Sequence, residues 1–383
     1  MRGRYLYLVA PVSIISLALL TLLAGSNSTG GSWHLVRLAP HQWPRFTDGG
    51  SASGLRLALE QESVWLDTAD LPDKFVIGGR VITREKLKAT VVRFLEFLDA
   101  TPGTDLNRYI EANFEVYACV ADRGLAAARF TGYYNPEVPA SRDSTAEFRY
   151  PLYRFPRNAR SRSTRKQIEE DGVLRGYEIA WLKDPFDRYA LHIEGSGTLE
   201  FPDSTRINAH YAGSNRRSYT SLGTEMLRDG LLAPGEATMP GIREWFKFHP
   251  DRLQEYLNRN RSYVYFRLDS GPPSGSTGLP LVPERSIATH QRYCPPGMLC
   301  WVSTRVPRVD SAGRTTGSRS WSRFVLNIDK GAAIKGPNRV DIFFGSGDDA
   351  QLYADRLDQT GRFYMLVAKD QPGMKVADRL SSR

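Results

Sequence analysis

Two apolar segments near the end of the chain each enclose one aspartate. Asp329 ends the segment 324–329, and Asp341 lies between Val340 and Ile342. The residue types favour strands, so the pattern predicts two short strands joined by a turn. A carboxyl group in such surroundings loses solvation when it ionises, which raises its pKa towards the range useful for proton transfer. The pattern also fits an exposed aspartate on an alternating edge strand, and this segment alone leaves both interpretations open.

Helical periodicity is concentrated in two parts of the chain. Apolar residues recur at helical spacing after Thr83, a residue type that caps helices, and predict a helix through Asp99 followed by a helical segment through Tyr117. Shorter helices are expected between Thr220 and Leu257, where glycine and proline mark their ends.

Period-two patterns rich in aromatic and β-branched residues begin at Ala128. They predict strands at 129–136, 150–155, 177–182, 189–201, 206–212, 261–267, 286–290, 299–305, 321–329, 340–344 and 362–368. Many short strands at this spacing are typical of a barrel or a sandwich. The Gly, Pro and Ser-rich stretch 271–278 indicates a crossing between domains.

The composition is that of a globular protein with room for two domains, because the 383 residues are 41% hydrophobic and 24% charged. The net charge of +9 suggests an anionic partner such as nucleic acid, a membrane surface or an acidic cell-wall polymer. The densest basic cluster, 154–166, is interleaved with Ser and Asn and is interpreted as a solvated loop. No nucleic-acid-binding motif is present, so we expect no nucleic-acid partner.

The N-terminus indicates export. Arg2 and Arg4 precede an apolar run from Tyr5 to Ala24, which is followed by a polar stretch. A cleaved signal peptide and an uncleaved membrane anchor both fit this pattern. Lipidation is not expected, because Ser26 stands where a lipoprotein signal would need cysteine.

The three cysteines are too few for a disulfide scaffold. Cys294 and Cys300 flank a loop short enough to close by a disulfide, and the sequence leaves open whether they pair. Cys119 lies in an apolar setting and is expected to be a buried, inert thiol. No Cys and His residues have metal-ligand spacing, so neither a metal nor a cofactor is predicted.

Several aromatic residues could bind a glycan by stacking on sugar rings, although they fit a protein core equally well. They are Tyr133, Tyr134, Trp181, Tyr211 and Tyr219. Ordinary glycoside hydrolysis requires two carboxyl groups, for which Asp329 and Asp341 would be the natural pair.

Ordered blocks from about Phe130 to Lys369 together resemble the membrane-bound lytic murein transglycosylase A family. The blocks are Phe130-Thr131-Gly132-Tyr133-Tyr134, Glu178-Ile179-Ala180-Trp181-Leu182, residues 192–197, Tyr219-Thr220-Ser221-Leu222-Gly223, residues 262–267, Val282-Pro283-Glu284-Arg285-Ser286 and residues 331–341. The resemblance implies a mainly β fold, in which a double-psi β-barrel domain contains an inserted second β-barrel domain, with several packing helices.

The implied domain bounds follow the blocks. Residues 1–32 would be the signal or anchor and linker, 33–135 the first part of the double-psi barrel, 136–270 the inserted barrel, and 271–383 the second part, a domain named for three aspartates. By resemblance, Asp341 is the catalytic acid and base and Asp329 supports it, while Thr131, Tyr133 and Lys335 bind substrate.

This chain departs from the family pattern in three motifs. The family's Ala-Val-Asp reads Ala288-Thr289-His290 here, so His290 stands where the family has its first aspartate. The family's Gln-Asp-Thr-Gly reads Ile328-Asp329-Lys330-Gly331, and Glu194 replaces a glutamine in the block around His192. These changes concern details of the site more than the reaction that the resemblance implies.

The implied reaction is exo-acting cleavage of the bond between N-acetylmuramic acid and N-acetylglucosamine in peptidoglycan. Asp341 would protonate the glycosidic oxygen and then accept the proton of the muramic C6 hydroxyl as that oxygen attacks C1, forming a 1,6-anhydro end without water. The expected protein is an exported, envelope-associated monomer whose partner is the peptidoglycan strand. A non-catalytic wall-binding protein and a two-carboxylate hydrolase are the alternatives.

Overall fold

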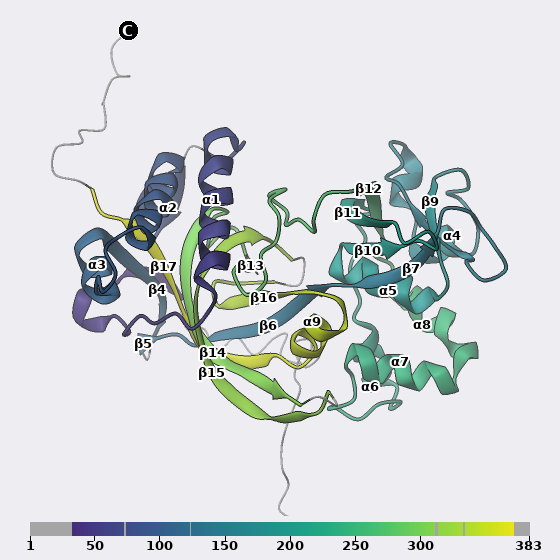
Figure 1. Cartoon of the computed structure of the whole chain (residues 1–383). Helices are drawn as coiled ribbons and strands as arrows, with labels where there is room; N and C mark the ends of the chain where they lie inside the picture. The colour runs from purple at the N-terminus through teal and green to yellow at the C-terminus, as the bar shows by residue number, and fades with distance from the viewer. Residues whose placement is uncertain (1–32, 73, 123, 311–312, 332–333, 371–383) are drawn as a thin grey trace, which may run out of the picture. The chain divides into compact units, whose positions relative to one another are not determined.

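The computed structural model describes residues 33–72, 74–122, 124–310, 313–331 and 334–370 (Figure 1). The segment predicted to be a signal or anchor, residues 1–32, lies outside this part of the chain. The fold is mainly β with several helices, as the sequence predicted. The described residues form two compact units, a smaller one of residues 157–174 and 214–263 and a larger one that contains the rest.

A nine-stranded sheet forms the framework of the larger unit. Its order is β1-β4-β17-β14-β15-β13-β16-β6, with β5 attached to β4 and with a further pairing of β17 to β6. That pairing closes six of the strands into a ring. The strands are β1 (His34–Arg37), β4 (Phe114–Ala121), β5 (Gly124–Leu125), β6 (Ala128–Asn135), β13 (Ser286–Thr289), β14 (Met298–Val309), β15 (Thr315–Asp329), β16 (Arg339–Ser346) and β17 (Asp358–Ala368).

A second sheet in the larger unit has the order β12-β11-β10-β7-β9-β8. Its end strands β12 and β8 lie next to each other, so this sheet also curves round a core. The strands are β7 (Glu137–Ser141), β8 (Tyr150–Tyr153), β9 (Glu178–Leu182), β10 (Gly197–Glu200), β11 (Arg206–Ser214) and β12 (Val264–Asp269). The two-stranded hairpin of β2 (Lys74–Ile77) and β3 (Arg80–Thr83) completes the strands of this unit.

Helices of the larger unit pack on these sheets. Thr83 caps α2 as predicted, because its side chain accepts a hydrogen bond from the Lys86 amide at 3.2 Å. Apolar residues of α1 and α2 enter the same core as the first sheet, including Leu59, Leu87 and Phe94. The helices are α1 (Ala52–Thr68), α2 (Arg84–Leu98), α3 (Leu106–Asn113), α5 (Pro185–Glu194) and α9 (Gly347–Ala354), with the 3-10 helix η2 (Pro40–Gln42).

The smaller unit is helical. Its helices are α4 (Arg165–Glu169), α6 (Leu222–Arg228), α7 (Met239–Phe248) and α8 (Leu253–Arg259), with η3 (Ala159–Arg162) and η4 (Pro250–Arg252). Arg165 corrects the prediction of a solvated loop over 154–166. It is fully buried, pairs with Glu169 at 2.7 Å and donates to the carbonyls of Asn260 and Ser262. A buried guanidinium needs such partners, which local sequence does not reveal.

Two secondary-structure predictions are wrong. The strand expected over 189–201 is helix α5 followed by the short strand β10, because Asp184 caps the helix and Gly195 ends it with φ of 80°. These start and stop signals outweigh the strand-forming residue types. The helical segment expected through Tyr117 stops at Asn113, where the chain enters β4, and β4 is held between β1 and β17.

The two aspartate-bearing strands do not pair with each other. Strand β13 lies between β15, which carries Asp329, and β16, which carries Asp341. Strand β16 is itself flanked by β13 and β6. The interpretation of Asp341 as an exposed residue on an edge strand is therefore wrong.

The cysteines are free thiols in the structure. Cys294 and Cys300 are buried, with their sulfur atoms 3.7 Å apart. Cys119 is buried as predicted, and burial raises the pKa of its thiol. None of the helices within the described ranges is long and apolar enough to cross a membrane.

Candidate active site

Four strands place the candidate carboxyl groups in one row across the sheet. Asp329 on β15 is in register with Ala288 on β13, Ala288 with Asp341 on β16, and Asp341 with Thr131 on β6. Residues opposite each other on paired strands point to the same face. Asp329 and Asp341 are thus two strands apart, or roughly 10 Å between Cα atoms at ordinary strand spacing.

Asp341 is held by weak polar contacts. The guanidinium of Arg339 donates to one of its carboxylate oxygens at 3.3 and 3.4 Å, and its shorter bond, 2.8 Å, goes to the Thr131 hydroxyl. The side chains of Asp341 and Arg339 are each 20% exposed. Burial raises the pKa of Asp341 even though Arg339 lowers it, which agrees with the sequence-based expectation.

Another pair continues the row beyond Thr131. Asp358 on β17 is in register with Thr131 and receives two bonds from Arg129, at 2.7 and 2.8 Å. Arg129 therefore has its own carboxylate partner and offers Asp341 a cation only at longer range, while the charge of Asp358 raises the pKa of Asp341.

Asp329 holds a loop in place. Its Oδ1 accepts the backbone amides of Ser276 and Lys330, both at 2.8 Å. Gly275 allows this approach, because a Cβ there would lie 2.5 Å from the Ile328 carbonyl oxygen. Burial raises the pKa of Asp329, although the two amides and Tyr133 lower it. The geometry is that of a structural carboxyl group at the end of the row.

The predicted substrate-binding residues occupy different positions. Thr131 is buried in the row, and Tyr133 lies two residues further along the same strand face, with its ring 5.3 Å from that of Phe343. Burial and then the charge of Asp329 raise the pKa of Tyr133 well above its ordinary value. Lys335 is exposed on the loop before β16, and the structure does not bring it into hydrogen-bond contact with Asp341.

Close packing explains why a glycine, Gly132, follows Thr131 in the motif. A Cβ at this position would lie 2.6 Å from the Cα of Ala354 in α9 and 2.8 Å from the ring of Phe344. The missing side chain lets α9 pack on β6 and β16, the two strands that carry Thr131 and Asp341.

Two further carboxyl groups, which the sequence analysis did not assign to the site, interact with it or lie next to it in the chain. Glu194, at the end of α5, has its pKa raised to about 8 by burial and by the charges of Asp355 and Asp341. Asp355, which follows α9, has its pKa raised to about 6 by burial. The departure from the family pattern at Glu194 was the available sequence signal, whereas Asp355 lies in an ordinary polar helix end.

The remaining candidates lie outside the carboxyl row. His290 follows β13 directly, and its ring lies tilted against that of Tyr293 with the centroids 5.2 Å apart. Its Nδ1 is buried and has no hydrogen-bond partner among the described residues. Among the aromatic candidates, Tyr134 is buried whereas Tyr211 and Tyr219 are about half exposed.

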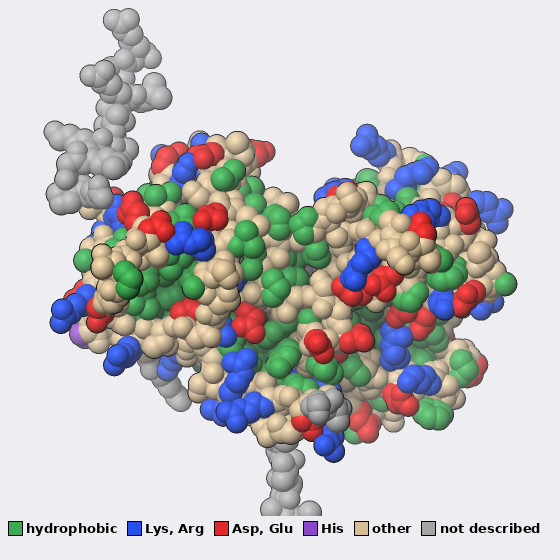
Figure 2. Space-filling model, viewed as in Figure 1, with side chains coloured by type: hydrophobic (Ala, Val, Ile, Leu, Met, Phe, Trp, Pro, Cys, Tyr) green, Lys and Arg blue, Asp and Glu red, His purple; other side chains and the backbone are tan. Residues whose placement is uncertain are grey.

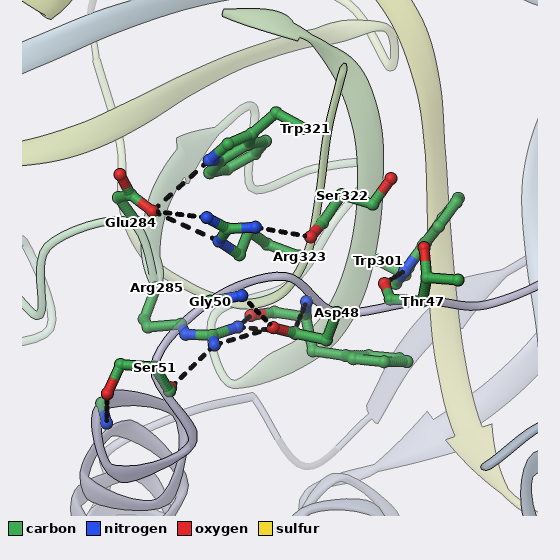
Figure 3. Close-up of polar contacts among 12 residues, drawn as sticks. Thr47, Asp48, Gly50, Ser51, Glu284, Arg285, Trp301, Trp321, Ser322 and Arg323 are labelled. Carbon is green, nitrogen blue, oxygen red and sulfur yellow. Dashed lines mark hydrogen bonds and ion pairs between the residues drawn. The ribbon is translucent and has the colours of Figure 1, made fainter. Parts of the chain in front are cut away.

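A second polar cluster lies on the first sheet near α1. Arg285 donates to both oxygens of Asp48, at 2.6 and 2.9 Å, and to the carbonyls of Phe324 and Ser51 (Figure 3). The nearby pair Arg323 and Glu284 is joined at 2.9 Å (Figure 3). Each cation has a carboxylate partner, so this cluster is suited to holding strand ends together.

Charge on the face seen in Figure 2 does not single out another site. Lys and Arg side chains are scattered among acidic ones over the face seen in Figure 2. No group of three or more Cys, His, Asp or Glu side chains in the described residues is arranged to hold a metal ion. The fold and the site thus define a mainly β protein with carboxyl groups of raised pKa on one sheet face, an arrangement suited to acid–base chemistry.

Comparison with known proteins gives the family. Residues 129–267 match the MltA specific insert domain, and residues 285–367 match the 3D domain. The crystallised lytic transglycosylase LtgG of Burkholderia pseudomallei is 30% identical, with 89% of this chain and 98% of that chain covered and a TM-score of 0.55. The chain belongs to the membrane-bound lytic murein transglycosylase A (MltA) family.

Other relatives agree with this assignment. Membrane-bound lytic murein transglycosylase A of Escherichia coli strain K12 is 32% identical over 248 residues, which are 64% of this chain and 66% of that protein. The crystal structure of E. coli MltA with bound chitohexaose shares the fold, with a TM-score of 0.73 at 24% identity over 88% of this chain and 95% of that chain. The chain thus spans about two thirds of the length of its E. coli relative in the sequence comparison.

Proposed function

We propose that this protein is a lytic transglycosylase that cleaves peptidoglycan between N-acetylmuramic acid and N-acetylglucosamine and leaves 1,6-anhydromuramic ends. The observation that carries the proposal is the Asp341 carboxyl group, which is partly buried, has a raised pKa and is contacted by one cation, Arg339, on a single oxygen at 3.3 Å. Membership of the MltA family supplies the reaction class.

In the proposed mechanism, Asp341 acts twice. The protonated carboxyl group gives its proton to the glycosidic oxygen as the C1–O bond breaks, and the N-acetylglucosamine side leaves as an alcohol. The resulting carboxylate accepts the proton of the C6 hydroxyl while the C6 oxygen bonds to C1. The proton count balances, and Asp341 returns to its acid form without water taking part.

The other residues would orient the substrate and the acid. Arg339 would stabilise the transient Asp341 carboxylate, because it is the cation that contacts this group among the described residues. Thr131 and Tyr133 flank Asp341 on the same sheet face and would contact the sugar, and Lys335 would reach it from its loop. Asp329 would support the site by fixing the loop through Ser276.

A two-carboxylate hydrolase fits the site less well. Asp329 is the only partner that the sequence suggested for Asp341, and it is already bound to two backbone amides. An inverting hydrolase needs a second carboxylate free to activate water, which this geometry does not favour.

The proposed setting follows from the resemblance and from the relatives. We propose an exported, envelope-associated monomer whose partner is a glycan strand, a chemistry represented by the chitohexaose bound to E. coli MltA. The proposed bounds remain 33–135 and 271–383 for the double-psi barrel and 136–270 for the inserted barrel. Exo action and an unlipidated N-terminus belong to the same proposal.

Digestion of purified peptidoglycan followed by mass spectrometry tests the function. Muropeptides lighter by one water than the corresponding hydrolysis products are expected. Hydrated reducing ends would indicate a hydrolase instead, and binding without any released product would indicate a wall-binding protein.

A further inference from the structure

Cys294 and Cys300 have their side chains in contact inside the core of the larger unit. Their sulfur atoms are 3.7 Å apart, and the two residues are 2% and 0% exposed. A disulfide bond is about 2.05 Å long, so the two atoms would have to move roughly 1.7 Å closer to be joined. Rotation of the two side chains about their Cα–Cβ bonds can supply a shift of this size.

The backbone on the Cys300 side of this contact is fixed by the first sheet. Cys300 is the third residue of β14, where it is in register with Val325 on β15 and with Met365 on β17. A strand paired on both sides cannot withdraw its residues without losing ladder hydrogen bonds. The sulfur of Cys300 is therefore held where Cys294 meets it.

The backbone on the Cys294 side is held by Asn327 of β15. The Asn327 side-chain amide donates to the carbonyls of Cys294 and Pro295, at 2.7 and 3.0 Å. The Asn327 carbonyl accepts the Gly297 amide at 2.9 Å. The loop between the two cysteines thus rests on the strand that pairs with β14, and this seating brings the two sulfur atoms together.

Helix α1 covers the loop. Gly297 has φ of 84°, and a Cβ there would lie 2.9 Å from Oε1 of Glu62 and 3.0 Å from Cδ2 of Leu66. Burial, and then the hydrogen bond with Cys294, raise the pKa of the Cys300 thiol well above its ordinary value. Because the thiolate is the reactive form, a thiol enclosed in this way exchanges slowly in the folded protein.

A metal site is another common use of two neighbouring cysteines. It needs further ligands, and in the part of the chain that the structure describes no group of three or more Cys, His, Asp or Glu is arranged to hold a metal ion. The third cysteine, Cys119, lies on β4, where its sulfur contacts the Val120 carbonyl at 3.9 Å. The contact between Cys294 and Cys300 therefore favours a bond within the pair.

We propose that Cys294 and Cys300 form a disulfide bond when the protein folds in an oxidising compartment. The bond closes a ring of seven residues and fastens the loop after β13 to the start of β14. The oxidant is itself a disulfide, carried by a protein or by a small thiol compound. The inference rests on the proposed export and not on the proposed reaction, because neither cysteine lies in the carboxyl row.

The bond forms in two exchange steps. The thiolate of one cysteine attacks the disulfide of the oxidant, which makes a mixed disulfide and releases one thiolate of the oxidant. The thiolate of the other cysteine then attacks the protein sulfur of the mixed disulfide and releases the second. Two electrons pass from the cysteines to the oxidant, and the two cysteine protons end on the two thiols of the oxidant.

Burial decides when these steps take place. Both thiols must be reached before α1 covers the loop, so the exchange belongs to folding. After α1 has packed, the same burial protects the bond from reductants. The disulfide is thus a permanent fastening of the fold and not a switch.

Peptide mass spectrometry of the exported, full-length protein tests the bond directly. The protein is unfolded without reductant, and its free thiols are alkylated with N-ethylmaleimide before digestion with trypsin. Cleavage after Arg292 and Arg305 releases both cysteines in one peptide, 293–305. We expect this peptide to carry no label and to be lighter by two hydrogen atoms than its reduced form. The peptide 109–123, which contains Cys119, should carry one label.

Refolding separates the cysteine pair from the cellular compartment. The purified chain is unfolded, reduced and refolded in a buffer of oxidised and reduced glutathione, and the same unlabelled peptide 293–305 is expected. Two labels on this peptide after either treatment would overturn the inference, and so would a bond from either cysteine to Cys119. Each of these results leaves the proposed function intact, because that function is measured by the release of anhydro products.

Thermal unfolding gives a second readout. Closure of a seven-residue ring predicts that the wild type refolded with reductant unfolds about 3 °C below the oxidised wild type. Cys119→Ser, the matched control, should show the same difference, whereas Cys294→Ser should show none. Each variant is compared with itself, so a loss of stability caused by the substitution does not affect the result. Equal midpoints for the two wild-type forms would contradict the fastening of the loop.

Discussion

The Asp341 row and the cluster of Arg285 with Asp48 use the same residue types in opposite ways. Both oxygens of Asp48 are bonded to Arg285, and Asp48 also accepts the amides of Gly50 and Phe324 at 2.8 Å. Asp341 has one cation in contact, at 3.3 Å or longer and on one oxygen. A carboxylate whose two oxygens are both bonded to a cation keeps its charge and holds structure. A carboxyl group with one long cation contact can exchange a proton.

The largest effect is expected at Asp341, the carboxyl group with the single long cation contact. Asp341→Asn keeps the shape of the side chain and removes the exchangeable proton, so release of anhydromuropeptides should fall at least about a thousandfold. Binding to insoluble peptidoglycan, measured by pull-down, should remain. Asp48→Asn provides the contrast, because its effect should appear in the unfolding temperature and much less in the rate per folded molecule.

In the cluster of Arg285 with Asp48, loss of the arginine should lower the stability of the fold. Arg285 is 2% exposed, and Arg285→Met leaves the Asp48 carboxylate without its partner, which should lower the free energy of unfolding by about 3–5 kcal/mol. Urea unfolding measures this change. Arg314→Met is the control, because that arginine is 79% exposed in its pair with Asp310 and should change stability by less than about 1 kcal/mol. Equal losses in the two variants would remove the distinction between the clusters.

An effect of at most the same size, dependent on pH, concerns a carboxyl group that no cation contacts within the described residues. Glu62 on α1 is fully buried, neither of its oxygens has a hydrogen-bond partner, and burial raises its pKa to about 8. Because the folded-state pKa lies above the unfolded value, its contribution to stability is complete below about pH 4 and is lost as the pH rises through 8.

Glu62→Gln should remove this dependence. The unfolding free energy of the wild type relative to the variant should fall by up to about 4 kcal/mol between pH 4 and pH 8. Urea unfolding at several pH values measures it. Glu60→Gln, an exposed neighbour on the same helix, should track the wild type, and a flat difference for Glu62→Gln would show that Glu62 ionises normally in the folded protein.

Sequence patterns located one of these two regions and missed the other. Asp341 could be found because an acidic residue interrupts an apolar strand, a local signal. Arg285 and Asp48 are 237 positions apart, and no local pattern connects them. Pairing of this kind depends on the closure of the sheet, which brings α1 and β13 together only in three dimensions.

The same limit applies within the site. The sequence suggested Asp329 and Asp341 as a pair on joined strands, but β13 inserts Ala288 between them. Glu194 was noted as a departure from the family, yet its segment was predicted to be a strand, so its position at the end of helix α5 could not be foreseen. Residue type was readable from the sequence, whereas register and strand order were not.

The central claim is that one carboxyl group transfers a proton twice within the substrate and that water takes no part. Digestion of peptidoglycan in water enriched in heavy oxygen tests this most directly, with mass spectrometry of the released muropeptides. The account predicts anhydro products that carry no heavy oxygen. Reducing ends that contain one heavy oxygen atom from the solvent would contradict it.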